Sequence, residues 1–269
     1  MNFDRYRVKP GKRVKLTKRD PNDRALFEGS KEDAAIRTLE LVDELEELQE
    51  VLYAESKQKL LIVLQGMDTA GKDGTIRLVF DGVNPSGVKV APFKKPTDDE
   101  LSRDFLWRVH QKVPARGEIV IFNRSHYEDV LVVRVHSLVP KRIWKTRYQQ
   151  IVDFEKLLTD TNTRILKFFL HIDRNEQKER LQARLAEPDK QWKFNMQDVA
   201  ERAHWDAYTK AYEAALSKTS TESAPWYIIP SNMKWYRSYV IASIVVETLK
   251  GMKIRHPDPD PALASVVID

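Results

Sequence analysis

Five short apolar runs, each separated from the next by a stretch with helical character, constrain the fold of this chain more than any other feature. The runs lie at 60–64, 88–92, 119–122, 165–172 and 226–229. Runs that are apolar at consecutive positions are typical of strands covered on both faces. The intervening segments predict helices at about 71–81, 98–112, 140–159, 174–187, 197–217 and 234–250. This alternation favours a three-layer α/β fold with a five-stranded parallel sheet and right-handed crossovers.

Polar segments flank this alternating region. Residues 1–29 contain two prolines and no clear period, which predicts an arm that lies on the core or is partly disordered. A helix follows, with Ser30 as its N-cap and a stripe of leucines along one face. The segment 256–269 contains three prolines and cannot continue a helix. We therefore expect one domain over 30–255, between the arm and a tail.

Composition excludes several classes of chemistry. The chain has 269 residues and no cysteine, which excludes disulfides, thiolate catalysis and Cys-ligated zinc. No apolar run approaches the roughly 18 residues that a membrane helix needs. The basic N-terminus lacks the apolar region of a secretory signal, so we expect a cytoplasmic protein. The net charge of +5 suggests a polyanionic partner, although on charge alone a mildly basic enzyme is the better interpretation.

The segment from Gly66 to Lys72 connects the first predicted strand to a helix and reads Gly-Met-Asp-Thr-Ala-Gly-Lys. This is the phosphate-binding pattern G-x-x-x-x-G-K in the context that it requires. Glycine lets backbone N–H groups turn toward a phosphate, and the helix adds its positive end. Lys72 supplies a mobile charge that can follow a transferred phosphoryl group. A glycine-bearing turn with a surface lysine is the structural alternative.

The loop departs from the usual pattern at two positions. Asp73 stands where most such loops have Ser or Thr, so the hydroxyl that normally binds Mg²⁺ is missing. Asp68 places a carboxylate beside bound phosphates, which repel it unless a cation or a proton lies between them. We infer that Asp68 orients a metal ion or an acceptor phosphate. A loop-stabilising Asx turn is the alternative.

Polar residues follow the third predicted strand directly. Asn123 occupies the position where P-loop kinases usually have a metal-organising aspartate. Arg124 comes next, at the sheet edge where ligands of α/β proteins bind, and its guanidinium can fork onto phosphate oxygens. Glu128 and Asp129 are candidates to replace the missing carboxylate as metal ligands. Charge complementarity at a helix N-terminus is an equally good interpretation of these two acids.

Basic residues cluster on the helix that follows the fourth strand. Arg180 and Arg184 are four residues apart and share a helix face, and Lys190 and Lys193 follow the proline that stops the helix. In nucleotide kinases this position holds a mobile lid whose arginines close over the phosphates and exclude water. We therefore expect a lid at about 174–205. A solvated basic helix is the alternative.

Together these segments resemble the polyphosphate kinase 2 family. The matching stretches are Gly66-Met67-Asp68 through Lys72-Asp73-Gly74, Phe122-Asn123-Arg124-Ser125-His126-Tyr127-Glu128, Pro188-Asp189-Lys190-Gln191-Trp192-Lys193, and Ile229-Pro230-Ser231-Asn232 with Trp235 and Arg237. The resemblance runs from about residue 25 to 250. Asn123, with the segments 81–87 and 129–136, looks most like the class III branch.

The resemblance implies a P-loop kinase fold similar to thymidylate kinase, with a helical lid and a basic channel. It implies transfer of the terminal phosphoryl group of inorganic polyphosphate to AMP and ADP, with Mg²⁺ or Mn²⁺ as cofactor. It also implies a homo-oligomer, which we expect to be a tetramer. We expect neither a nucleic-acid nor a membrane partner.

The resemblance also assigns roles to residues. The catalytic ones are Asp68, Lys72, Arg124, Arg180 and Arg184. Those expected to bind substrate are Gly66, Met67, Thr69, Ala70, Gly71, Asp73, Gly74, Asn123, Glu128, Lys190 and Lys193. The metal ligand would be Asp68, with Glu128 and Asp129 as further candidates. Two other functions stay open: an ATP-dependent nucleoside monophosphate kinase and a non-catalytic polyanion-binding protein.

Overall fold

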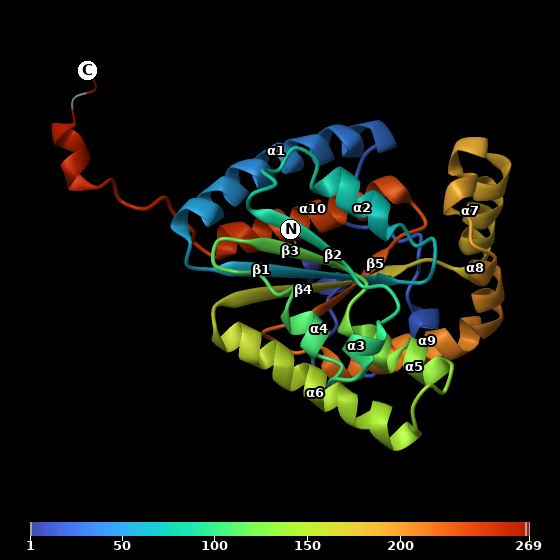
Figure 1. Ribbon diagram of the computed structural model, residues 1–269. Helices are drawn as coiled ribbons and strands as arrows, with labels where there is room; N and C mark the ends of the chain where they lie inside the picture. The colour runs from blue at the N-terminus through green and yellow to red at the C-terminus, as the bar shows by residue number, and fades with distance from the viewer. Residues whose placement is uncertain (1, 267, 269) are drawn as a thin grey trace.

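A five-stranded parallel sheet in the order β2-β3-β1-β4-β5 forms the centre of the molecule (Figure 1). The computed structural model describes residues 2–266 and 268, apart from the side chains of 190, 193, 264 and 265. The strands are β1 (Lys59–Gly66), β2 (Val88–Pro92), β3 (Ile119–Asn123), β4 (Thr163–His171) and β5 (Trp226–Pro230). All five lie within two residues of the predicted runs, and the predicted α/β sheet is confirmed.

Helices cover both faces of the sheet, which explains why the runs at 60–64 and 119–122 are apolar at consecutive positions. On one face lie α1 (Lys31–Glu55), α2 (Lys72–Val79) and α10 (Lys234–Gly251); on the other lie α6 (Lys141–Asp160) and α9 (Trp205–Thr219) (Figure 1). Every side chain from Leu60 to Leu64 is fully buried. A strand with only one covered face would alternate apolar and polar residues instead.

The first helix begins as the sequence predicts. The Ser30 hydroxyl accepts a hydrogen bond from the Asp33 N–H at 3.0 Å, and the Asp33 carboxylate accepts one from the Ser30 N–H at 2.9 Å. This reciprocal capping box satisfies two N–H groups that would otherwise have no partner. Leu41, Leu45 and Leu52 are buried, and α1 packs against α10.

Two predicted helices are interrupted in the structure. The segment 98–112 contains two short helices, α3 (Asp98–Leu101) and α4 (Trp107–His110), because the Asp104 carboxylate accepts the Leu106 N–H and turns the chain between them. The segment 197–217 divides into α8 (Met196–Glu201), a 3₁₀ turn at Arg202–His204, and α9. Within that turn, Arg202 donates to the Gln177 side chain at 2.9 Å. Each break depends on a polar contact, which hydrophobic periodicity does not detect.

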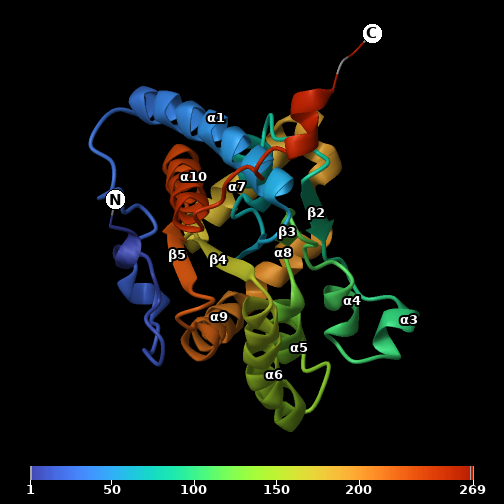
Figure 2. The ribbon, with the colours of Figure 1, turned by 90° about the vertical axis from the view of Figure 1, so that its left-hand side faces the viewer.

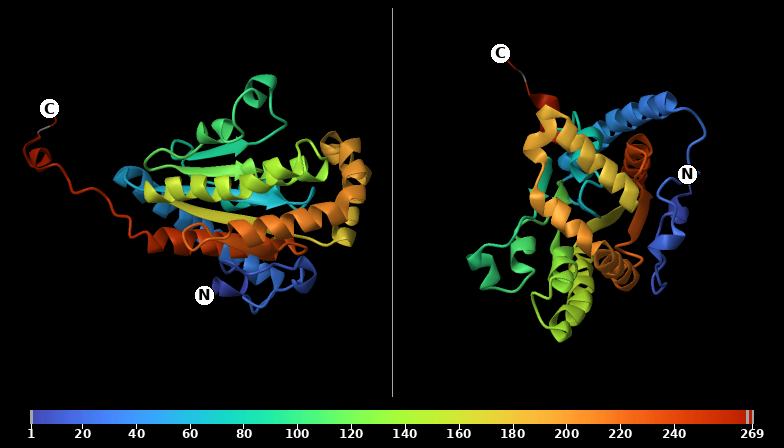
Figure 3. Two further views of the ribbon diagram at one scale, coloured as in Figure 1. Left: turned by 90° about the horizontal axis from the view of Figure 1, so that it is seen from below. Right: turned by 90° about the vertical axis from the view of Figure 1, so that its right-hand side faces the viewer.

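The lid region stands at the carboxyl ends of the strands. It consists of α7 (Arg174–Ala186), a 3₁₀ turn (Pro188–Lys193) and α8. Figure 3 shows these golden and orange helices across one end of the molecule, beyond the sheet. Short elements also lie in the arm, between β3 and α6, and in the tail. They are 3₁₀ turns at Phe3–Arg5, Leu16–Lys18, His126–Val130 and Pro261–Ser265, and the helix α5 (Val132–Val135).

The two ends of the chain behave differently. The arm lies along β5, where the Val8 N–H donates to Trp226 O at 2.8 Å and the Ile228 N–H donates to Tyr6 O at 2.9 Å (Figure 2). Its apolar side chains, including Phe3, are buried in the common core. The tail after Lys253 extends away from the body and is mostly exposed (Figure 1). None of the helices in the described residues has the length and hydropathy to traverse a bilayer.

Candidate active site

Two glycines set the path of the loop between β1 and α2. Gly66 ends β1, and a Cβ placed on it would lie 2.9 Å from the carbonyl oxygen of Leu170. Gly71 is the N-cap of α2 and has a φ of +105°, which residues with a side chain rarely adopt. The loop therefore turns tightly at the carboxyl edge of the sheet and directs the N-terminus of α2 toward that edge.

Lys72 is held inside this turn. Its Nζ donates to the Gly66 carbonyl oxygen at 3.2 Å, and its side chain is buried. Burial and the nearby Arg124 lower the pKa of Lys72 to about 8. A cation in this state gains from the arrival of an anion, because a phosphate would relieve both the burial and the repulsion from Arg124.

Three charged side chains meet beside the loop. Arg124 has a φ of +63°, and its N–H donates to Leu64 O at 3.1 Å. Its Nη2 donates to Asp68 Oδ1 at 2.7 Å, and its Nη1 lies 3.8 Å from Glu128 Oε2. The Arg124 side chain is 40% exposed, so it remains accessible to a ligand.

The two unusual polar residues of the sequence are bonded to each other. The Asn123 Nδ2 at the end of β3 donates to Asp73 Oδ1 at 2.6 Å. Asn123 thus has an amide at the position that usually has an aspartate, and the carboxylate is instead that of Asp73, next to the loop. This exchange keeps one carboxylate at the junction of β3 and α2.

A match to a protein family fits this geometry. The model of the family described as Polyphosphate kinase 2 (PPK2) matches residues 28–257. The chain belongs to this family. The AMP/ADP-polyphosphate phosphotransferase of Meiothermus ruber is 57% identical over 266 residues, which cover 98% of this chain and 99% of the relative. The ADP-polyphosphate phosphotransferase of Rhodopseudomonas palustris is 42% identical, covering 96% and 93%.

A solved structure shares the fold. The crystal structure of polyphosphate kinase 2 from Arthrobacter aurescens TC1 aligns with a TM-score of 0.90 at 42% identity and covers 96% of each chain. The resemblance inferred from the motifs is thereby confirmed, as is the fold of the PPK2 family.

Arg180 has a different place from the one expected of a lid arginine. Its side chain is buried beneath the loop and donates to the carbonyl oxygens of Thr69 and Ala70 at 2.9 and 3.1 Å. It also donates to the carbonyl oxygens of Ser231 and Asn232 at 2.6 and 3.0 Å, and its Nε donates to Glu176 at 2.6 Å. All five donors of the guanidinium are thus engaged within the protein. In this structure Arg180 therefore braces the loop, and its role toward phosphate stays a prediction.

Arg184 lies on the lid and faces α8. Its Nη1 is 3.6 Å from Asp198 Oδ2, and both side chains are partly exposed. Burial, followed by the negative charge of Asp68, raises the pKa of Asp198. The side chains of Lys190 and Lys193 lie outside the described part of the structure.

The metal candidates separate into two groups. Asp68 and Glu128 both face Arg124, whereas Asp129 turns to α6, where it accepts from Arg147 Nη1 at 2.8 Å. Burial raises the pKa of Asp129 to about 6. In this structure Asp129 is the partner of Arg147, and its role as a metal ligand stays a prediction. No group of three or more metal-binding side chains occurs within the described residues.

Sequence analysis missed the contribution of the lid and of α9 to the loop. The Tyr212 hydroxyl donates to Gly66 O at 3.1 Å, and the Gln177 amide donates to Asp68 O at 3.1 Å. Together with Trp205 and Tyr208 these residues enclose a cavity of about 30 Å³ beside Asp68, large enough for a water molecule. Tyr208 and Tyr212 are four residues apart and so share one face of α9, and this spacing is the sequence signal that could have identified them.

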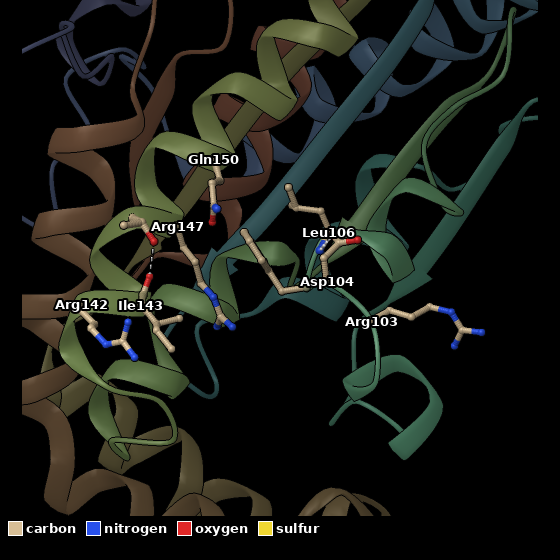
Figure 4. A pocket seen from close by; sticks show the side chains of 9 residues that line it. Arg103, Asp104, Leu106, Arg142, Ile143, Arg147 and Gln150 are labelled. Carbon is tan, nitrogen blue, oxygen red and sulfur yellow. Dashed lines mark hydrogen bonds between the residues drawn. The ribbon is translucent and has the colours of Figure 1, made fainter.

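An arginine-lined hollow lies outside the loop, between the α3–α4 connection and the first half of α6 (Figure 4). Its volume is about 630 Å³. Arg103, Arg142 and Arg147 project from its two sides (Figure 4). The guanidinium of Arg147 lies 4.7 Å from the centre of the Phe105 ring and also binds Asp129. This hollow adjoins the segment that carries Glu128, but it shares no lining residue with the cavity beside Asp68.

A second charged group is sealed behind the strand ends. The Lys167 ammonium donates to the Glu155 carboxylate, to the Tyr127 hydroxyl at 3.0 Å and to Thr219 O at 2.7 Å. The His126 ring nitrogen Nε2 lies 3.3 Å from Glu155 Oε1. Although burial opposes it, Lys167 and His126 lower the pKa of Glu155. This group fixes the turn that follows Arg124.

Proposed function

We propose that this chain transfers the terminal phosphoryl group of inorganic polyphosphate to AMP and ADP, forming ADP and ATP. The contact between Asp68 and Arg124 beside Lys72 carries the proposal. It puts a binding site for the phosphate of the nucleotide next to the loop that would bind the phosphate of the polymer. The name of the relative from Meiothermus ruber supports the use of both AMP and ADP that marks class III, and the name of the relative from Rhodopseudomonas palustris supports the use of ADP.

The transfer is direct and in line. The terminal phosphoryl group of the polymer lies over the loop at Gly71 and Lys72. An oxygen of the terminal nucleotide phosphate attacks its phosphorus, and the bond to the bridging oxygen breaks. The shortened polymer leaves as the anion, while Lys72 and Arg124 offset the charge that spreads over the transferred group. No phosphoenzyme forms.

The family's need for a divalent cation fits the acids beside the loop. Mg²⁺ (or Mn²⁺) prefers oxygen ligands and usually takes one or two carboxylates together with substrate phosphates. Asp68 and Glu128 offer such oxygens: Arg124 engages one oxygen of Asp68 at 2.7 Å, and it lies only at 3.8 Å from Glu128. We assign Asp68 and Glu128 as the residues that would hold the cation, which would neutralise phosphate charge.

A donor-omission experiment tests the proposal. Purified protein receives AMP or ADP, polyphosphate and Mg²⁺ without ATP, and nucleotides are resolved over time by chromatography. We expect AMP to give ADP first and ATP later. Turnover of AMP only when ATP is supplied would identify an ATP-dependent kinase. Salt-sensitive binding of polyphosphate without any product would identify a polyanion-binding protein.

The proposal includes three features that rest on the resemblance and the sequence alone: a tetrameric homo-oligomer, a cytoplasmic location, and no nucleic-acid partner. Light scattering coupled to size-exclusion chromatography tests the first. A mass of one or two chains would contradict the tetramer.

A further inference from the structure

Arg237 lies directly beneath the phosphate loop and is 3% exposed. Its Nη1 donates to the Ala70 carbonyl oxygen at 3.1 Å, and its buried Nε has no hydrogen-bond partner within the described residues. A Cβ placed on Gly71 would lie 2.0 Å from Nη1, so the guanidinium touches the loop backbone itself. The side chain comes from the first turn of α10.

This buried cation differs from its counterparts in having no acidic partner. Lys167 is paired with Glu155 and Arg180 with Glu176, whereas no carboxylate among the described residues lies within ion-pair distance of Arg237. Burial and the nearby Arg180 lower the pKa of Arg237 to about 10. A buried charge without an opposite charge destabilises the fold, so its retention calls for a compensating anion or a positional role.

The geometry of one peptide group shows what the guanidinium does. The Ala70 carbonyl oxygen accepts from both Arg180 and Arg237, at 3.1 Å each. The peptide bond to Gly71 is trans, so its N–H points away from the carbonyl and away from both arginines. Within the described residues the Gly71 N–H donates to no acceptor. It is therefore available to a ligand on the opposite side of the loop.

We propose that Arg237 is a positioning residue of the phosphate cradle. Together with Arg180 it fixes the peptide between Ala70 and Gly71 with the N–H toward the transferred phosphoryl group, and its unpaired charge is offset when that anion binds. Hydrogen bonds from two cations to one carbonyl also polarise the peptide and strengthen its N–H as a donor. The inference rests on the proposed function only for the identity of the anion.

Two consequences separate this role from a merely structural one. Replacing Arg237 with Met removes an unpaired buried charge and leaves an apolar chain of similar length, so the ligand-free protein keeps or gains stability. The same change weakens phosphate binding, with a rise in KM for polyphosphate of roughly 10–100-fold and a smaller change in kcat. A structural residue would show the reverse pattern.

The experiment measures melting temperatures of Arg237→Met, Arg237→Lys and wild type, with and without tripolyphosphate, together with KM and kcat. Ser238→Ala is the matched control, because Ser238 is buried on the same helix and its hydroxyl donates only within the helix, to Lys234 O. Tripolyphosphate raises the melting temperature of a protein that binds it in the folded state. We expect that rise to be nearly lost in Arg237→Met, partly kept in Arg237→Lys and unchanged in Ser238→Ala.

An equal rise in Arg237→Met and wild type would overturn the inference. So would a large loss of ligand-free stability with KM unchanged. If Arg237→Met does not fold, the KM of Arg237→Lys for polyphosphate tests the inference. A KM equal to that of wild type would overturn the inference. The proposed function fails separately: wild type would then respond to ATP but not to tripolyphosphate, and the comparison of Arg237→Met with wild type would be made on ATP.

Discussion

Two charged groups on either side of the segment 123–128 differ in how their charges are neutralised. The interior group pairs Lys167 with Glu155 and surrounds both with hydroxyl and carbonyl partners. The loop group leaves Lys72 bonded to a carbonyl oxygen and Arg124 partly exposed. The first is sealed from solvent, whereas the second is partly open to it, with Arg124 beside Asp68 and near Glu128.

The difference indicates which group binds a ligand. A buried pair whose partners are all present holds the backbone in place and has nothing to offer a substrate. Lys72, whose buried ammonium donates to the Gly66 carbonyl oxygen, attracts an anion, and a bound phosphate offsets the cost of burying its charge. Because both groups attach to one short turn, the interior pair sets the direction of Arg124 and Glu128.

The largest expected effect is the loss of activity when Lys72 of the loop group is replaced. Lys72→Met should lower kcat/KM for polyphosphate about 10⁴-fold, since it removes the charge that accompanies the transferred group. Melting temperature should stay the same or rise, because a buried ammonium with a lowered pKa is lost. Product formation by luminescence and thermal melts check this. Wild-type rates in the variant would refute the site.

Substitutions in the interior group should instead lower stability. Glu155→Leu or Lys167→Met alone should each lower the free energy of unfolding by about 3–5 kcal/mol, because each leaves an unpaired buried charge. The double variant should recover most of the loss. Urea unfolding of the four proteins completes the cycle. Additive losses would show that the two residues do not act as a pair.

A finer comparison is between Asp68, which bonds to Arg124, and Asp129, which bonds to Arg147. Asp68→Asn should lower transfer about 100-fold and raise the Mg²⁺ concentration for half-maximal rate, since the carboxylate offers the cation an oxygen. Asp129→Asn, the matched control, should leave the Mg²⁺ dependence unchanged because Asp129 is bonded to Arg147. A shift in both variants would return Asp129 to the metal site.

The smallest effect concerns pH. Because the pKa of Lys72 is lowered to about 8 from 10.5, the folded protein loses this proton first as pH rises. KM for polyphosphate should then increase above pH 8, by at most about tenfold per pH unit.

The same shift affects stability. Between pH 8 and 10.5 Lys72 binds more protons in the unfolded chain than in the folded one, so its contribution to the free energy of unfolding rises with pH. Lys72→Met lacks that contribution. Its difference in melting temperature from wild type should shrink from pH 8 to 10; a constant difference would contradict the assignment.

Several features of the site could be predicted because they are encoded by neighbouring residues. Gly66, Gly71 and Lys72 were recognisable from their spacing, and Ser30 from the acid three positions later. Each depends on backbone geometry over a few residues. Asp68 and Arg124 could be placed at the same sheet edge because parallel strands end there together.

Partner choice could not be predicted in the same way. Arg180 and Arg184 share a helix face, yet one is buried under the loop and the other faces Asp198. Asp129 follows Glu128 directly, but Glu128 lies near Arg124 whereas Asp129 bonds to Arg147 on α6. Nothing in the local pattern pairs Asn123 with Asp73, 50 positions apart.

The strands, the loop and the family could be derived from the order of residues alone, because apolar runs, glycine positions and short motifs depend on a few neighbouring residues. Which cations have acidic partners and which do not follows only from the folded molecule. That balance depends on distances between residues far apart in the chain, and a change of a few ångströms turns a phosphate ligand into a brace for the loop.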